Sequence, residues 1–130
     1  MIAVAESCTG GAIMAKLVER PGASQWFAGG QVLYQDADKI RFGVRAEDIA
    51  THTSQSALVT EELARLVREH YGAETGLAVT GNADEGHGWV AICTSDGVDV
   101  EAVHASGSRV ENIAAFRDAA LALLPADQLP

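Results

Sequence analysis

The chain has 130 residues, of which 48% are hydrophobic and 21% charged, and its 18 acidic and 9 basic residues give a formal net charge of −9. This length is enough for one domain over residues 1–130 and too short for two independent cores. The basic residues are scattered, which excludes a basic patch for nucleic acid, although a single arginine or a helix N-terminus can still bind a small anion.

The sequence also indicates where the protein is located and whether it binds a metal ion. No apolar stretch approaches the roughly 20 residues of a membrane-spanning helix, and the chain start lacks the basic region of a signal peptide. We therefore expect a cytoplasmic protein with no membrane partner. Cys8 and Cys93 form no CxxC pair, and the histidines form no metal-spaced pair, so we expect neither a disulfide nor a metal site.

The first elements in chain order are a strand, a glycine-rich turn and a helix. Residues 2–5 predict a short buried strand, and residues 7–11 turn into an apolar helical pattern that stops at residues 21–22, a Pro-Gly pair. A second strand is predicted over residues 25–34, where residues 29–30, two glycines, mark a bulge or a close backbone approach.

A short charged helix is predicted over residues 36–42, directly after this second strand. Asp36 or Asp38 would accept hydrogen bonds as its N-cap. Lys39 would then lie about one helical turn past Tyr34 at the strand end. The spacing therefore allows these two side chains to converge.

The middle of the chain predicts two more helices and a strand. A short helix covers residues 46–50, and Thr60 caps a longer amphipathic helix that ends at residues 71–72, a Tyr-Gly pair. A continuous apolar strand over residues 77–80 then enters a loop over residues 81–88. This loop either covers a ligand or is an ordinary acidic surface connection.

The last part of the chain predicts a hairpin and a helix. Residues 89–94 and 98–104 flank an Asp-Gly turn signal, and Ser106 or Ser108 opens a helix that stops at Pro125. The alternation of helices and strands predicts an α/β fold, a three-layer α/β/α sandwich with a mixed, mostly parallel sheet.

Ser7 is the candidate nucleophile because it lies at a strand-to-helix turn. Backbone N–H groups at a helix start can hold an oxyanion, and glycines let a ligand approach the backbone closely. Alternatively, Ser7 or Thr9 only N-caps the helix. Cys8 is either an activated thiolate at the helix start or an inert buried side chain.

Lys39 is the candidate base for Ser7. Burial disfavours an ammonium and lowers the pKa of a lysine toward neutrality, which would let Lys39 accept a proton. The alternative is a solvated surface lysine, and for Tyr34 it is an aromatic at a sheet edge with its hydroxyl in water. A serine–histidine–acid triad is possible only by long-range folding, which disfavours it.

Residues 5–11, with the sequence AESCTGG, closely resemble the signature of the CinA carboxy-terminal domain, the nicotinamide-nucleotide amidase family. The resemblance covers nearly the whole chain. Its other matches are residues 21–30 with PGSSxxFxGG, residues 34–39 with YSNxxK, residues 60–64 with SEEVA, residues 78–81 with the strand before a glycine-rich loop, and residues 107–109 with GDR.

The resemblance implies the fold of this family and hydrolysis of nicotinamide mononucleotide to nicotinate mononucleotide and ammonia, without metal or another cofactor. Ser7 would attack the carboxamide carbon, while Lys39, relayed or oriented by Tyr34, would take the serine proton and return it to ammonia. Arg109 would bind the substrate phosphate. The other substrate-binding residues that the resemblance implies are Cys8, Thr9, Gly10, Gly11 and Thr80.

Three departures from the family pattern keep alternatives open. Residues 81–88 form a shorter loop with two acids, which would repel a phosphate, and Asp36 would help to keep Lys39 protonated. A serine amidohydrolase with a different, uncharged substrate and a ligand-binding module without turnover are therefore alternatives. The chain also begins six residues before Ser7, without a preceding helix, so we expect a second copy, in a homo-oligomer, to cover one sheet face or edge.

Overall fold

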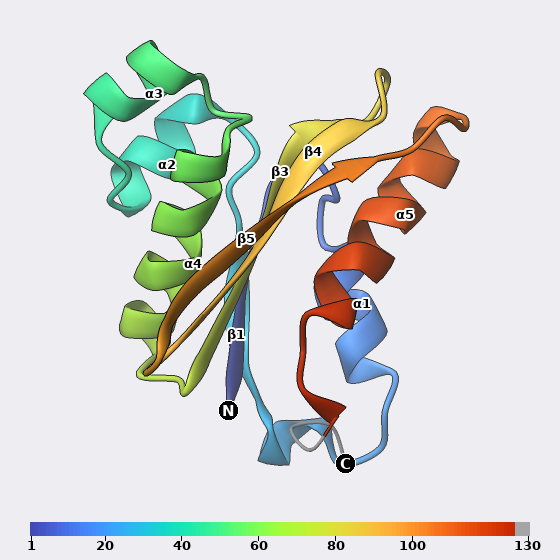
Figure 1. Cartoon of the computed structure of the whole chain (residues 1–130). Coiled ribbons are helices and arrows are strands. Elements are labelled where there is room, and N and C mark those ends of the chain that lie inside the picture. The colour runs from blue at the N-terminus through green and yellow to red at the C-terminus, as the bar shows by residue number, and fades with distance from the viewer. Residues whose placement is uncertain (127–130) are drawn as a thin grey trace.

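One five-stranded sheet organises residues 1–126, the part of the chain that the computed structural model describes (Figure 1). Its strand order is β2-β1-β3-β4-β5. β1 pairs in parallel with β2 and β3, whereas β3–β4 and β4–β5 are antiparallel, so β4 alone runs against the other strands. The bounds are β1 Ile2–Glu6, β2 Phe27–Val32, β3 Thr75–Asn82, β4 His87–Thr94 and β5 Gly97–His104.

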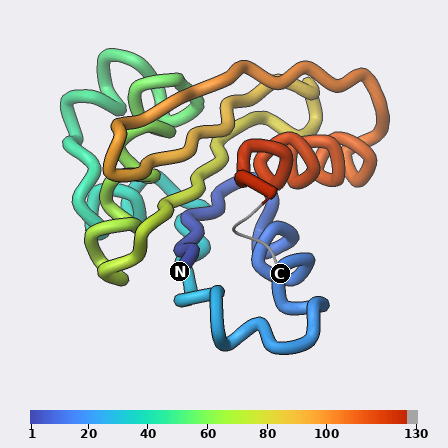
Figure 2. The backbone as a smooth tube through the Cα atoms, turned by 60° about the horizontal axis from the view of Figure 1, so that its bottom comes forward, coloured from blue at the N-terminus to red at the C-terminus, as the bar shows by residue number. Residues whose placement is uncertain are grey.

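Helices cover both faces of this sheet, which confirms the predicted three-layer α/β/α sandwich. Figure 1 shows α1 (Ala12–Val18) and α5 (Arg109–Ala122) on one face and α4 (Ala57–Tyr71) on the other, and Figure 2 shows the same division from a second side. The short helices α2 (Asp36–Phe42) and α3 (Ala46–His52) lie near the start of α4. Within residues 1–126, no helix combines the length and hydropathy that crossing a membrane requires.

The core consists of two hydrophobic clusters, one on each face of the sheet. Alternating residues of the inner strand β1 divide between them: Val4 is in the same cluster as Phe116, under α1 and α5, and Ala5 is in the same cluster as Leu63, under α4. All five residues of β1 are buried, as expected for a strand with neighbours on both sides and helices on both faces. The turn that follows β1 therefore begins at a strand that is packed on all sides.

Several predicted boundaries shift by a few residues. The 25–34 segment is not one strand, because Ala23–Gln25 forms a 3-10 helix, η1, and β2 ends at Val32. The expected cap of the long helix is wrong, because Ser56 is the N-cap of α4 and its hydroxyl accepts the Val59 N–H. Thr60 lies one turn inside, and its hydroxyl donates to the Ser56 carbonyl.

The N-cap of α2 and the loop after β3 also differ from expectation. Gln35 is the N-cap, with no side-chain cap, so neither Asp36 nor Asp38 serves in that role. Half of the residues 81–88 are strand: β3 continues to Asn82 and β4 begins at His87, which leaves a four-residue turn between them. The predicted β4–β5 hairpin is confirmed, and Ser108, one of the two expected residues, caps α5.

Gly76 of β3 allows α4 to lie close to the sheet. A Cβ atom at this position would come within 2.1 Å of the Ala64 carbonyl oxygen, a backbone atom that cannot rotate away. We expect Gly76→Ala to lower the free energy of unfolding by about 1–3 kcal/mol, as overpacking of a close contact does. Urea denaturation measures this loss. Arg65→Ala, on the exposed side of the same helix, is the control, and equal stability of the two variants would contradict the close approach.

Candidate active site

The turn between β1 and α1 is organised around the carboxylate of Glu6, which is completely buried. Its Oε1 accepts hydrogen bonds from the Thr9 hydroxyl and from the N–H groups of Gly11, at 3.2 Å, and Ile13, at 3.0 Å. Its Oε2 accepts from the Met14 N–H at 2.8 Å. The carboxylate thus satisfies donors at a helix start that would otherwise need water or a ligand.

Ser7 and Thr9 do not cap α1, so that alternative is wrong. The N-cap is Gly11, whose φ of 113° lies in a region that favours glycine, and no side chain of the cap residue contributes a hydrogen bond. The Thr9 hydroxyl is committed to Glu6. Ser7 is therefore left free to face a different partner.

That partner is Lys39, from α2. Its Nζ lies 3.0 Å from the Ser7 Oγ, and it also donates to the carbonyl oxygens of Leu33, at 2.9 Å, and Tyr34, at 3.1 Å. An uncharged amine has two N–H donors and one lone pair. The two carbonyls can take both donors, which leaves the lone pair for the Ser7 hydroxyl proton.

The surroundings of Lys39 favour that uncharged form. The residue is only 2% exposed, and burial lowers the pKa of its amine from the ordinary 10.5. The Asp36 and Asp38 carboxylates, and Cys8 in its thiolate form, would act in the opposite direction, but the net shift is downward. The alternative of a solvated surface lysine is thus wrong, and the effect expected of Asp36 is present but outweighed.

Cys8 faces the same site but as a neutral thiol. Its side chain is buried, and this burial is the largest of the influences that raise the pKa of the Cys8 thiol to about 11. A thiol with that pKa is protonated at neutral pH and is a weak nucleophile. The alternative of an activated thiolate is therefore wrong.

Ser7, Cys8 and Lys39 open into a cavity of about 210 Å³. The cavity lies beside the carboxyl ends of β1 and β3. β1 connects to β2 on one side of it, and β3 connects to β4 on the other side. Ligands of open α/β sheets bind at such a point, where the strand order reverses. Sequence patterns missed two residues of its wall, Ser54 and Gln55 from the α3–α4 connection. They follow Thr53, whose φ of 69° strains the backbone. No sequence pattern in this segment predicts that conformation or the place of the two residues in the cavity.

Tyr34 and Arg109 also line this cavity and contact each other. The Arg109 Nη2 donates to the Tyr34 hydroxyl at 3.0 Å, and its Nη1 lies 3.1 Å from the Asp84 Oδ1. The Tyr34 hydroxyl therefore does not stand between Ser7 and Lys39, which touch directly. Its carbonyl oxygen, and not its phenol, is what contacts the amine.

Three other expected substrate-binding residues lie differently. Thr80 is completely buried and its hydroxyl lies 2.8 Å from that of Thr60, on the α4 face of the sheet, while the next residue, Gly81, reaches the cavity. The Gly10 N–H donates to the Ser7 carbonyl and the Gly11 N–H to Glu6. Of the amides expected to hold an oxyanion, those of Cys8 and Thr9 remain as candidates.

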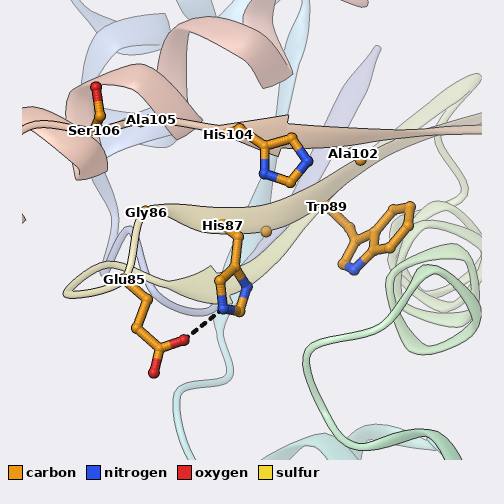
Figure 3. A pocket seen from close by; sticks show the side chains of 9 residues that line it. Glu85, Gly86, His87, Trp89, Ala102, His104, Ala105 and Ser106 are labelled. Carbon is orange, nitrogen blue, oxygen red and sulfur yellow. Dashed lines mark hydrogen bonds and ion pairs between the residues drawn. The ribbon is translucent and has the colours of Figure 1, made fainter.

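A second, larger cavity of about 560 Å³ lies on the other side of the β3–β4 turn. Figure 3 shows Trp89 and the imidazoles of His87 and His104 around it, with Glu85 turned toward His87. The Glu85 Oε2 lies 2.6 Å from the His87 Nε2. Neither Ser7 nor Lys39 lines this cavity, so it is separate from the Ser–Lys pair.

Known proteins resemble this chain over most of its length. The family model described as the CinA C-terminal domain matches residues 1–127. A CinA-like protein from Mycobacterium sp. (strain JLS) is 46% identical over 88 residues, which cover 67% of this chain and 21% of that protein. The chain thus spans about a fifth of the length of such relatives.

Solved structures show the same fold. A competence or damage-inducible protein from Enterobacter asburiae superposes with a TM-score of 0.93 at 25% identity, covering 98% of this chain and 86% of that one. The competence/damage inducible protein CihA from Agrobacterium tumefaciens has a TM-score of 0.87 at 29% identity, with 95% and 82% covered.

Replacing Glu6 by glutamine tests the role of the buried carboxylate. Glu6→Gln keeps the size but turns one acceptor into a donor that faces backbone N–H groups, so we expect a loss of about 2 kcal/mol in the free energy of unfolding. Thermal and urea denaturation measure it. Glu19→Gln is the matched control, because that carboxylate is exposed at the other end of α1. A Glu6 variant as stable as the control would refute the role.

Proposed function

The chain belongs to the CinA C-terminal domain family, and on that premise we propose that it is a serine amidohydrolase that cleaves the C–N bond of a carboxamide. Nicotinamide mononucleotide, converted to nicotinate mononucleotide and ammonia, is the substrate that the family resemblance implies. The observation that carries this proposal is the 3.0 Å contact between the Lys39 Nζ and the Ser7 Oγ, at a cavity and with the amine buried.

In the proposed mechanism the Ser7 Oγ attacks the carboxamide carbon and gives its proton to the Lys39 Nζ. The tetrahedral oxyanion would accept hydrogen bonds from the Cys8 and Thr9 amides. Lys39, now an ammonium, returns the proton to the leaving nitrogen as the C–N bond breaks, which releases ammonia and leaves an ester on Ser7. Water, deprotonated by the same amine, then hydrolyses the ester and restores the serine.

The burial of Lys39 supports both halves of this cycle. Burial disfavours a positive charge on the amine, which favours the uncharged form of Lys39 as the base and favours release of the proton that it has taken. The carbonyls of Leu33 and Tyr34 can stabilise the transient ammonium, because each already accepts a hydrogen bond from the same nitrogen. Ser7 and Lys39 thus form a complete nucleophile and base without a histidine.

Removing the amine should abolish turnover. We expect Lys39→Met to slow ammonia release from nicotinamide mononucleotide by about 10²–10⁴-fold, the usual contribution of a general base. Ser7→Ala should lose activity as well. Lys16→Met, which changes an exposed lysine on α1, is the matched control and should leave the rate unchanged.

Folding of each variant is checked by circular dichroism. Normal hydrolysis by Lys39→Met would remove the amine from the mechanism. Binding of the nucleotide with no ammonia release by the unsubstituted chain would favour the ligand-binding module over the enzyme.

The reaction should also depend on pH in a defined direction. Since the uncharged amine is the base, kcat/KM should rise as pH rises through the pKa of Lys39, which burial places below 10.5. Stability should rise in the same interval, because there the unfolded chain binds a proton at Lys39 that the folded chain does not. Lys39→Met should flatten this contribution to the stability profile. A rate that falls with pH across the interval would contradict the base assignment.

A further inference from the structure

The arginine at the candidate site is already paired with an acid of this chain. We propose that Asp84 discriminates against phosphorylated substrates, so that this site prefers a carboxamide without a phosphate to the same carboxamide with one. The inference rests on the proposed function for the carboxamide itself and adds the class of molecule that carries it. Three observations support the inference: the contacts of Arg109, the charges that line the cavity and the hydrogen bonds of the β3–β4 turn.

Both ends of the Arg109 guanidinium are occupied. Nη1 pairs with the Asp84 Oδ1 at 3.1 Å and Nη2 donates to the Tyr34 hydroxyl at 3.0 Å. A phosphate binds arginine best through two parallel hydrogen bonds from the same planar group. The edge formed by Nη1 and Nη2 can bind a phosphate in that way only if the Asp84 carboxylate leaves Nη1.

The Asp84–Arg109 pair offers an anion no net attraction. Lys39, Asp84 and Arg109 are ionisable side chains that line the cavity, and burial disfavours the charged form of Lys39. Asp84 and Arg109 carry opposite unit charges and lie 3.1 Å apart. A phosphate that displaced Asp84 would still lie beside its negative charge, whereas an uncharged ligand leaves the pair intact.

The backbone of the β3–β4 turn holds Asp84 in this position. The Asn82 side-chain oxygen accepts the N–H groups of Asp84 and Glu85, each at 3.0 Å, and the Asn82 carbonyl accepts the Gly86 N–H at 2.9 Å. The Gly86 carbonyl in turn accepts the Ala105 N–H at 2.6 Å, which ties the turn to the end of β5. The Asp84 carboxylate can rotate, but these hydrogen bonds hold the backbone of the turn next to Arg109.

The Arg109–Asp84 pair is exposed to solvent, and this exposure limits how strongly Asp84 can oppose phosphate binding. The side chains of Arg109 and Asp84 are 47% and 72% exposed, and such pairs contribute little to stability. A phosphate can therefore compete with Asp84, and we expect a preference and not exclusion. The cavity of about 210 Å³ agrees with a small ligand, because sites for drug-sized molecules usually measure roughly 300–1,000 Å³.

The neighbouring acid in the same turn provides a matched control. Glu85 pairs with His87 and lines the larger cavity of Figure 3, not the one that holds Ser7. Glu85→Gln and Asp84→Asn therefore remove the same unit of charge from adjacent positions of one turn. Only the second removes it from Arg109.

The test compares nicotinamide mononucleotide with nicotinamide riboside, which differs only by the phosphate. Calorimetry on the full chain with Ser7→Ala measures binding without turnover, and the two turn substitutions are then added to it. We expect Ser7→Ala to bind the riboside more tightly than the nucleotide. Asp84→Asn should tighten nucleotide binding about five- to tenfold and leave riboside binding unchanged, and Glu85→Gln should alter neither.

Tighter binding of the nucleotide than of the riboside by the Ser7→Ala chain would overturn the inference. So would equal effects of Asp84→Asn and Glu85→Gln, or no binding of either compound. Ammonia release by the chain with Ser7 intact tests the proposed function separately. If neither compound is hydrolysed while the affinities behave as expected, the amidase proposal fails and the discrimination by Asp84 stands.

Discussion

The contact between the Ser7 hydroxyl and the buried amine of Lys39 is the interaction on which the rest of the site depends. A lysine is rarely buried unless its nitrogen has partners, and here the ends of two elements supply them. The carbonyls of Leu33 and Tyr34 follow β2, and Ser7 follows β1. Because β1 and β2 are parallel neighbours, both sets of groups reach the same edge of the sheet, and α2 only has to bring the amine to them.

Glu6 performs a complementary task on the other side of the nucleophile. The first N–H groups of a helix attract anions, and in many α/β proteins this is where a ligand phosphate binds. Here the carboxylate of the last β1 residue takes that place, with hydrogen bonds to Gly11, Ile13 and Met14. The turn that presents Ser7 is thereby held by an anion of the protein itself, and an anionic group of a substrate must be recognised elsewhere.

Sequence patterns predicted the elements that local rules decide and missed those that depend on packing. Ser108 was one of two capping candidates for α5, and it was right because a capping box with Glu111 is a local arrangement. Thr60 was wrong as a cap because Ser56, one turn earlier, has the same chemistry. The pairing of Arg109 with Asp84 and the inward turn of Thr80 join residues far apart in the chain, which periodicity cannot reveal. A buried Lys39 was one of two interpretations, and only the packed structure decides between them.

The site has two parts that line one cavity and meet at Tyr34, whose carbonyl oxygen accepts from Lys39 and whose hydroxyl accepts from Arg109. The β1–α1 turn and α2 carry the nucleophile and the base, and both rest on the buried parallel part of the sheet. The β3–β4 turn and the start of α5 carry the Asp84–Arg109 pair, at an exposed hairpin end. A change in the length or charge of that turn can therefore alter which molecule is accepted while the Ser7–Lys39 contact stays as it is. The Asp84 carboxylate is a charge of that kind, because it pairs with Arg109 and is no part of the Ser7–Lys39 contact.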